Sequence, residues 1–272
     1  MSNTTPNNFV LFSGRQFRAT ITNHKSQITK KMKFFYILYQ YLIAWPILLV
    51  ITIFTAIFTI IFVPFRNAEF VHKEQQFWSK CAFWLFFLPV SVDGLENIKP
   101  GQSYVFVANH QSMFDVWLVY GWLPVVFKWL MKAELRKVPF VGTACKAAGH
   151  IFVDRRNAKA AMESLQEIEK QLTNGVCTVI FPEGTRSLNG EVGRFKRGAF
   201  QIAMDLGLPV IPLSLSGCFE VLPKGKPFVH RHAVHMHVGE PIDLKQFKDV
   251  EGKPDANAAI EAVRNAVIAG IK

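Results

Sequence analysis

Residues 34–65 contain no charged residue, and this run limits what the chain can fold into more than any other feature. As one straight helix it would extend about 48 Å, well beyond a hydrocarbon core of about 30 Å. Pro46 has no backbone N–H for the helical hydrogen-bond ladder, so it predicts a break within the run. A secretory signal has a much shorter apolar core and a cleavage site of small residues. We therefore predict that the chain associates with a membrane.

The segments on either side of this run indicate how the chain meets the membrane. Residues 1–33 carry several cations and no acidic residue, which is typical of a basic arm beside anionic headgroups, although a solvated tail is equally compatible. Residues 77–90 form an aromatic-rich patch that is too short, at about 21 Å, to span a bilayer. A single crossing with the arm inside would place the rest of the chain outside the cell. We therefore favour a helical pair embedded mainly in one leaflet, with the rest of the chain in the cytoplasm.

From Ser91 onward the pattern changes to that of an α/β domain, entered through a loop at residues 93–101. Apolar runs too short for helices alternate with segments of helical spacing, which predicts a mixed sheet flanked by helices. The expected strands are 104–108, 123–130, 176–180, 208–216 and 233–238, with helices at 116–122, 159–172, 199–206 and from about 255. The predicted domains are therefore a basic arm (1–33), a membrane-associated helical segment (34–90) and an α/β domain (91–272).

Composition narrows the choice of partners. The chain has a formal net charge of +11, and 50% of its residues are hydrophobic. A basic chain favours an anionic partner, and the apolar excess without a nucleic-acid-binding motif points to a membrane surface rather than nucleic acid. The 4 cysteines lie far apart without a C-x-x-C pair, so reduced thiols are expected rather than disulfides or a zinc site.

A histidine and an aspartate follow the first predicted strand. The strand ends before His110, and Asp115 begins the next apolar run after a short polar turn. A carboxylate at this spacing can fold back onto the imidazole, fix its tautomer and leave the other ring nitrogen free as a base. His110 and Asp115 are therefore candidate catalytic residues for deprotonating a hydroxyl. A chance pairing is the alternative, because a lone His and Asp at this spacing are common.

A second polar turn, Phe-Pro-Glu-Gly-Thr-Arg-Ser, follows the strand predicted at 176–180 and occupies residues 181–187. Open α/β sheets build their sites at the carboxyl edge, where the ends of neighbouring strands meet. We therefore expect this turn to face the His110–Asp115 pair across one cleft.

Together the two segments resemble the motifs of the glycerolipid acyltransferase family, and within it the 1-acylglycerol-3-phosphate acyltransferases. Asn109, His110 and Asp115 meet the family's first motif, and residues 181–187 meet its third motif without a departure. The resemblance extends from about Ser103 to Pro241 and includes a second motif region at residues 132–155 and a fourth at 210–213. Either motif alone would be moderately specific, whereas the pair in this order is highly specific.

The resemblance implies transfer of a fatty acyl group from acyl-CoA or acyl-carrier-protein to the free hydroxyl of 1-acyl-sn-glycerol 3-phosphate (lysophosphatidic acid). The product would be phosphatidic acid, an intermediate of phospholipid biosynthesis. His110, oriented by Asp115, would take the proton of the hydroxyl, which stands where serine stands in a serine-protease triad. No cofactor or metal is expected beyond the thioester co-substrate. The enzyme would lie in a bacterial-type inner or plasma membrane with its catalytic domain facing the cytoplasm.

The phosphate of the acceptor needs fork-shaped or multiple cationic donors, which favours arginine. Arg186 is the first candidate and Arg155 the second, and Lys196 is a further candidate for the phosphate or for an acidic carrier. Glu183 would orient the turn, and Gly184 would let its backbone approach the ligand closely. The substrate-binding set is completed by the remaining residue of the turn, Thr185.

Three other functions remain open on the sequence. The same chemistry could act on another lyso-lipid, such as a lyso-ornithine lipid, or water could replace the alcohol in a membrane-tethered acyl hydrolase. A catalytically inert lipid-binding protein is the third. His235 and His237 could share one face of a strand and bind a metal, but no carboxylate or cysteine lies at ligand spacing, so exposed strand polarity is expected.

Overall fold

The computed structural model describes residues 30–153, 172 and 175–272. The chain divides into two compact units, Met1–Trp45 and Pro46–Lys272, and each is described by itself. Arg155 and most of the helix predicted at 159–172 lie outside the described residues.

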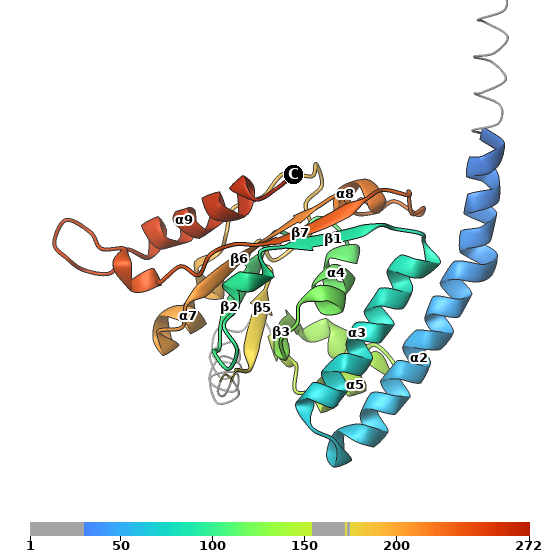
Figure 1. The fold of residues 1–272 in the computed structure, drawn as a ribbon, viewed down its shortest axis with the longest axis horizontal. Coiled ribbons are helices and arrows are strands. Elements are labelled where there is room, and N and C mark those ends of the chain that lie inside the picture. The colour runs from blue at the N-terminus through green and yellow to red at the C-terminus, as the bar shows by residue number, and fades with distance from the viewer. Residues whose placement is uncertain (1–29, 154–171, 173–174) are drawn as a thin grey trace, which may run out of the picture. The chain divides into compact units, whose positions relative to one another are not determined.

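Among the described residues, seven strands of the unit Pro46–Lys272 form one sheet in the order β1-β7-β6-β2-β5-β3-β4 (Figure 1). Strand β7 is antiparallel to β6 and parallel to β1, and the other neighbouring pairs are parallel. The predicted mixed sheet is therefore confirmed. The strands are β1 (Val90–Asp93), β2 (Val105–Ala108), β3 (Phe127–Lys132), β4 (Ile151–Val153), β5 (Cys177–Ile180), β6 (Val210–Ser216) and β7 (Val234–Val238).

The central strands are apolar along their whole length because both faces of the sheet are covered. Every residue of β2 and β5 is buried, as expected for parallel strands between two layers of helices. Val105 and Val107 of β2 join Val263 and Val267 of α9 (Ala256–Ala269) in one buried cluster. Figure 1 shows α9 on one side of the sheet, and α3 (Ala68–Leu85) and α4 (Phe114–Trp122) on the other.

Strand β1 is not among the expected strands, because the residues from 93 onward are expected to form the loop that enters the domain. The strand forms at the edge of the sheet, where Val90 pairs with Val234 and Asp93 with His237. Its residues are only partly buried, so they carry no apolar run. The expected loop therefore begins only after Asp93. The shorter helices are α5 (Val141–Ala147), α7 (Gln201–Leu206) and α8 (Cys218–Val221).

A helical pair precedes the sheet, as predicted. Helix α2 (Trp45–Phe62) ends in a 3-10 turn, and Asn67 caps α3 by accepting a hydrogen bond from the N–H of Phe70 at 2.9 Å. The indole of Trp78 donates to the hydroxyl of Thr52 at 2.9 Å and so joins the two helices. The second helix begins at residue 68 rather than 77, because its first turns are polar and the sequence pattern showed only its aromatic half.

The predicted break at Pro46 is not found: the helix continues past the proline, and a π-helical turn, Gln40–Ala44, ends two positions before it. A wider turn accommodates a residue that cannot donate to the helical ladder. Helical residues extend from Lys30 to Phe65, long and apolar enough to cross a membrane. Only 22% of the most apolar window of this helix is buried, unlike the core helix of a soluble protein.

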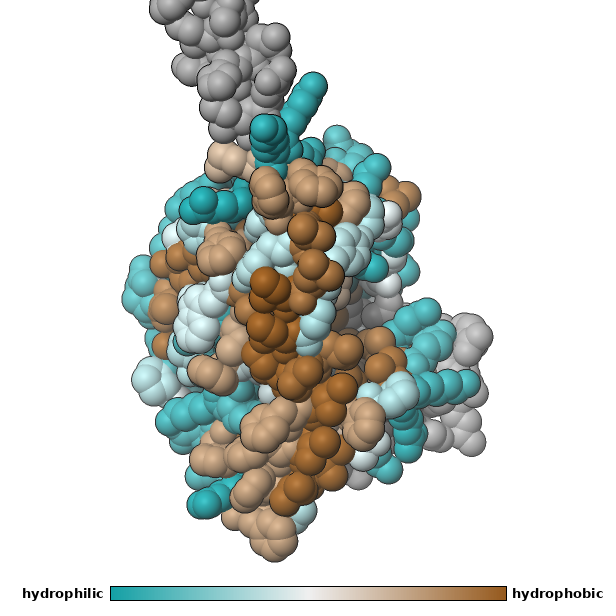
Figure 2. Space-filling view, turned by 90° about the vertical axis from the view of Figure 1, so that its right-hand side faces the viewer, coloured by the Kyte–Doolittle hydropathy of each residue, from teal (hydrophilic) through white to brown (hydrophobic). Residues whose placement is uncertain are grey.

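Large apolar side chains are exposed along the part of α2 that belongs to the second unit (Figure 2). Monomeric soluble proteins rarely expose a continuous apolar face of this kind, which indicates membrane association. The exposed side chains include Ile47, Leu49, Val50, Phe54, Ile57 and Ile61.

A chain of buried hydrogen bonds joins α3 and α4 to the edge of the sheet. The N–H of Trp129 donates to Nδ1 of His150 at 3.2 Å, so the proton of the neutral imidazole is on Nε2. Nε2 lies 2.7 Å from the hydroxyl of Tyr120, which in turn donates to Oε1 of Gln75 at 2.6 Å. The donors and acceptors of this chain match only while His150 is neutral.

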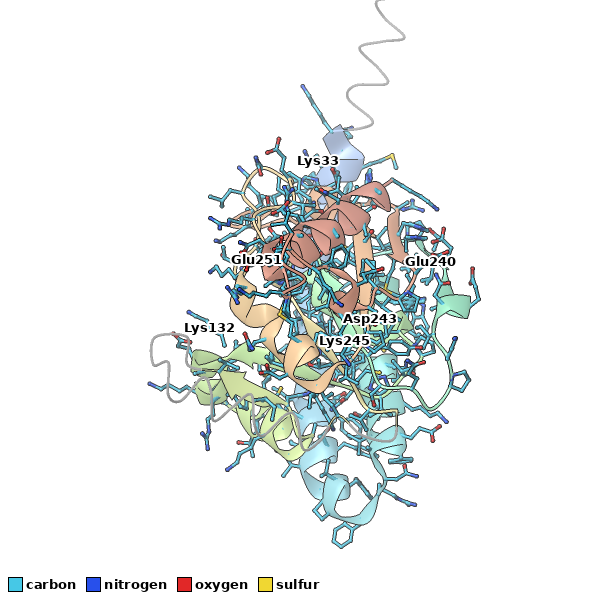
Figure 3. All side chains as sticks on the ribbon, turned by 90° about the vertical axis from the view of Figure 1, so that its left-hand side faces the viewer. Lys33, Lys132, Glu240, Asp243, Lys245 and Glu251 are labelled. Atoms are coloured by element: carbon cyan, nitrogen blue, oxygen red, sulfur yellow. The ribbon has the colours of Figure 1, made fainter. Side chains whose placement is uncertain are left out.

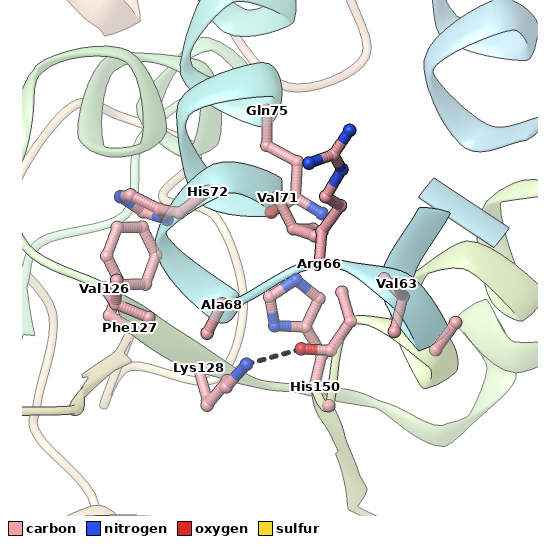
Figure 4. Close-up of a pocket in the computed structure, with 13 residues that line it drawn as sticks. Val63, Arg66, Ala68, Val71, His72, Gln75, Val126, Phe127, Lys128 and His150 are labelled. Carbon is pink, nitrogen blue, oxygen red and sulfur yellow. Dashed lines mark hydrogen bonds between the residues drawn. The ribbon is translucent and has the colours of Figure 1, made fainter. Parts of the chain in front are cut away.

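Beside this network lies a cavity of about 250 Å³ (Figure 4). Its polar lining includes His72, Gln75 and Lys128, and the ammonium of Lys128 donates to the carbonyl of Ala148 at 2.6 Å. Burial, with smaller contributions from Lys128 and His72, lowers the pKa of His150 to about 3.

Acid should therefore destabilise the fold through His150. Its pKa is about 3 when folded and 6.5 in the unfolded chain, so the unfolded chain takes up the proton first. This contribution to the free energy of unfolding is complete above pH 6.5 and is lost as the pH falls towards 3. Between pH 7 and pH 5 we expect a loss of about 2 kcal/mol.

The measurement is the denaturant midpoint at both pH values in detergent. His150→Gln should be less stable at pH 7 but should lose much less stability on going to pH 5. The control is His230→Gln, because His230 is exposed and its replacement should keep the wild-type pH dependence. The same loss in His150→Gln as in the wild type would contradict this assignment.

Candidate active site

His110 follows the carboxyl end of β2, the strand between β5 and β6. The preceding residue, Asn109, is fully buried and ties this end of β2 to β6. Its Nδ2 donates to the carbonyl of Leu215 at 2.9 Å, and its Oδ1 accepts the N–H of Leu215 at 2.8 Å. The point where the chain leaves the sheet is therefore fixed by two hydrogen bonds.

The structure brings His110 and Asp115 into direct contact. Nδ1 of His110 lies 2.9 Å from Oδ2 of Asp115. The same oxygen accepts the main-chain N–H groups of Gln111 and Ser112, the latter at 2.8 Å. Because Oδ2 faces only donors, it selects the imidazole tautomer with hydrogen on Nδ1, which leaves Nε2 as an acceptor. Asp115 is fully buried, whereas the side chain of His110 is 17% exposed.

The imidazole plane is held by stacking. The rings of His110 and Phe181 lie 4.0 Å apart between centroids and are inclined by 14°. Trp129 stacks in turn on Phe181, with 5.3 Å between the ring centroids. The motif Phe-Pro-Glu-Gly-Thr-Arg-Ser contains Phe181, but nothing in the sequence indicates that its ring covers the histidine.

Glu183 connects the two motifs through the main chain. Its Oε1 accepts the N–H of His110 at 2.8 Å, and its Oε2 accepts the N–H of Gly193 at 3.1 Å. A Cβ on Gly193 would lie 2.9 Å from Oε2, so a larger residue here would push the carboxylate out of this position. Burial raises the pKa of Glu183, and the two N–H donors partly oppose this rise. The carboxylate thus holds backbone segments together, which agrees with the orienting role expected for it.

The turn at residues 183–187 lies against His110. The N–H of Ser187 donates to the carbonyl of His110 at 2.8 Å, and Gly184 has a φ of 76° that favours glycine. The turn and residues 188–194 line an open hollow of about 580 Å³, whose cations are Arg186 and Arg194. Arg186 is partly buried and makes no ion pair with any acidic residue in the described part of the chain.

The other predicted site residues lie differently. The main-chain N–H of Lys196 donates to Pro182 at 3.1 Å, but its side chain is exposed and does not line the hollow. Thr185 is exposed at the hollow, and Arg155 lies outside the described residues. Lys132, in the second motif region, is exposed at the end of β3 (Figure 3). Its ammonium pairs with the carboxylate of Glu134 at 3.2 Å.

His235 and His237 are paired rather than exposed, contrary to expectation. Nδ1 of His237 lies 2.5 Å from Oδ1 of Asp93, and Nε2 of His235 lies 3.3 Å from Oδ2. Lys272 also pairs with Asp93. Asp93 could not be found as a partner from the sequence, because only the pairing of β1 with β7 brings its carboxylate close to the two histidines. Within the described ranges, no three His, Cys, Asp or Glu side chains are arranged to hold a metal ion.

Comparison with known proteins agrees with this geometry. The profile of the family described as Acyltransferase matches residues 89–216. The crystal structure of the 1-acyl-sn-glycerophosphate (LPA) acyltransferase PlsC from Thermotoga maritima superposes with a TM-score of 0.71 at 32% identity, covering 88% of this chain and 96% of that one. The chain belongs to the glycerolipid acyltransferase family.

Within that family, its similarity is to 1-acyl-sn-glycerol-3-phosphate acyltransferases. The chloroplastic LPAT1 of Arabidopsis thaliana is 30% identical over 197 residues, which are 72% of this chain and 54% of the plant protein. The alpha form from Ovis aries is 38% identical over 186 residues, which are 68% of this chain and 63% of the sheep protein. The chain therefore spans between about half and two thirds of the length of these curated relatives.

Proposed function

We propose that this protein transfers a fatty acyl group from an acyl thioester to the free hydroxyl of 1-acyl-sn-glycerol 3-phosphate, giving phosphatidic acid for phospholipid biosynthesis. The observation that carries the proposal is the contact between Nδ1 of His110 and Oδ2 of Asp115 at 2.9 Å, beside the turn 183–187. The names of the relatives and of the structural neighbour support the same acceptor.

The contacts of His110 account for each proton in the reaction. With hydrogen on Nδ1, Nε2 accepts the proton of the acceptor hydroxyl as its oxygen attacks the thioester carbonyl. The C–O bond forms, the tetrahedral intermediate collapses, and the C–S bond breaks. The imidazolium then returns its proton to the departing thiolate, which leaves as the free thiol. Asp115 stabilises the imidazolium in between, and no covalent acyl-enzyme is needed.

The apolar helix and the cytoplasmic origin of acyl thioesters support an arrangement at the membrane. The exposed apolar side chains of α2 would lie in lipid, with the catalytic domain facing the cytoplasm of a bacterial-type cell. The lyso-lipid would then reach His110 from the bilayer, and acyl-CoA or acyl-carrier-protein would reach it from water. The basic charge of +11 favours the anionic surface of such a membrane.

A panel of acceptors tests the proposed function. Protein in detergent micelles is supplied with labelled acyl-CoA and, in parallel, with lysophosphatidic acid, other lysophospholipids or lyso-ornithine lipid. We expect the highest kcat/KM for the phosphate monoester. Equal or higher values for another acceptor would overturn the assignment, and release of free fatty acid without any acceptor would identify a hydrolase.

Replacing Arg186 with alanine should weaken acceptor binding more than chemistry. A guanidinium that binds phosphate forms charge-assisted hydrogen bonds, and losing them should raise the KM for lysophosphatidic acid about 10- to 100-fold. Arg186→Lys should fall between alanine and the wild type, since lysine keeps the charge but not the fork.

Steady-state kinetics at several acceptor concentrations provide the measurement. Arg136→Ala serves as a matched control, because Arg136 is exposed away from the hollow and its loss should leave the KM unchanged. An acceptor KM in Arg186→Ala equal to that of the control would remove Arg186 from the phosphate site.

A further inference from the structure

Lys224 touches the turn 183–187 from a part of the chain that none of the acyltransferase motifs includes. It lies in the connection between α8 and β7, and its ammonium donates to the hydroxyl of Thr185 at 3.0 Å. Thr185 lines the open hollow and immediately precedes Arg186. A second cation is thus held next to the arginine that we place at the acceptor phosphate.

The backbone that carries Lys224 is fixed on both sides. Ser112, which also donates its N–H to Asp115, donates its hydroxyl to the carbonyl of Leu222 at 2.8 Å. After Lys224, the N–H of Lys226 closes a tight turn on the carbonyl of Pro223 at 3.1 Å. The lysine is therefore anchored to the segment of the catalytic histidine at one end of its loop and to the turn 183–187 through its side chain.

The charges around Lys224 leave its ammonium available to an anion. In the described part of the chain it makes no ion pair, and its one side-chain partner is a neutral hydroxyl. An ammonium has three N–H donors, so two remain. Both oxygens of the nearby Glu183 already accept main-chain N–H groups. Within the described ranges, Glu183 therefore makes no ion pair with Lys224 or Arg186.

We propose that Lys224 is an acceptor-binding residue that contacts the phosphate monoester together with Arg186 and selects it over phosphodiester headgroups. This inference rests on the proposed function. A phosphate monoester carries about −1.5 to −2 charges near neutral pH, with three oxygens to accept hydrogen bonds. A phosphodiester carries one charge and has fewer free oxygens, so a second cation benefits it less. In the absence of the acceptor, the hydroxyl of Thr185 holds the ammonium of Lys224 in position.

Replacing Lys224 with methionine, which keeps the length and removes the charge, tests this role. The matched control is Lys226→Met, which removes the same charge two residues further along the same turn, where the side chain is exposed. Initial rates are measured with lysophosphatidic acid and with a lysophosphodiester, at fixed acyl-CoA and then with acyl-CoA varied.

We expect Lys224→Met to raise the KM for lysophosphatidic acid about tenfold, with kcat within about threefold and the acyl-CoA KM unchanged. The preference for the monoester over the diester should fall by a similar factor, and Lys226→Met should behave as the wild type. Lys224→Arg should retain most of the preference, since it keeps the charge.

Two outcomes would overturn the inference: equal kinetics in Lys224→Met and Lys226→Met, or a loss of kcat with an unchanged acceptor KM. Should Lys224→Met fold poorly, Thr185→Val removes the hydroxyl that holds the ammonium and should raise the same KM less strongly. An unchanged KM in that variant would also count against the proposal. Failure of the proposed function looks different, because the wild type itself would then not prefer lysophosphatidic acid.

Discussion

Replacing His110 with alanine is expected to lower kcat by about 10²- to 10⁴-fold or more, with the acceptor KM nearly unchanged. In the proposed mechanism the imidazole is the base. Of the other titratable side chains of the described site, Asp115 is buried, and both oxygens of Glu183 bind main-chain N–H groups. An alcohol that keeps its proton attacks a thioester slowly.

The variant should still fold, because most of the contacts at this position use the main chain. The N–H of His110 donates to Glu183 and its carbonyl accepts from Ser187, and alanine keeps both. The ring stack with Phe181 and the bond to Asp115 are lost. Radioactive product formation, membrane association and the melting midpoint are measured together. The control is His230→Ala, at an exposed position. Activity retained in His110→Ala would remove the histidine as the base.

The parts of the fold that the sequence predicted correctly are those in which local pattern and burial agree. Strands β2 and β5 are apolar at every position because both faces of the sheet are covered, and a short apolar run of this kind cannot be a helix. The last helix begins where Asp255 caps it, its side chain accepting the N–H groups of Asn257 and Ala258. In such elements, neighbours in sequence supply most of the signal.

The parts that the sequence missed depend on partners far along the chain. Strand β1 exists because it pairs with β7, and the same pairing brings Asp93 to His235 and His237. No local pattern could indicate this, because the carboxylate and the imidazoles are on different strands. The boundaries of the arm and of the membrane segment stay predictions.

The candidate site divides in the same way. The motifs indicate which residues are expected to carry chemistry, since His110, Asp115 and Arg186 are polar residues that follow predicted strands. The supporting contacts could not be predicted from the sequence. They are the stacking of Phe181 on His110 and the hydrogen bonds from the N–H of His110 to Glu183 and from the ammonium of Lys224 to Thr185. These contacts depend on how loops fold over the sheet edge.

Replacing Asp115 with asparagine should separate the charge of this residue from its orienting role. Oδ2 accepts three N–H groups, from His110, Gln111 and Ser112. An asparagine would therefore place its carbonyl oxygen there, because an NH₂ group would meet three donors. The histidine tautomer is kept, and the negative charge that stabilises the imidazolium is lost. We expect kcat to fall about 10²- to 10³-fold, since an ion pair at about 4 Å is worth about 4 kcal/mol at an effective dielectric constant of 20.

The size of the loss in Asp115→Asn, compared with Asp115→Ala, decides between two roles. If charge matters beside orientation, asparagine keeps both substrate KM values and falls between alanine and the wild type in kcat. Full activity would show that orientation alone suffices. A loss of about 10⁴-fold, as in a triad whose histidine takes the wrong tautomer, would mean that the amide turns its NH₂ towards His110. Oδ1 is buried, and the further contact of this carboxylate is with the thiol of Cys218, a weak hydrogen-bonding group. The NH₂ group placed there would find no strong acceptor among the described residues and should also cost about 1–3 kcal/mol of stability. A lower melting midpoint with unchanged KM values would therefore indicate two roles for Asp115. Its charge stabilises the imidazolium, and its hydrogen bonds hold the loop of residues 110–112 in place.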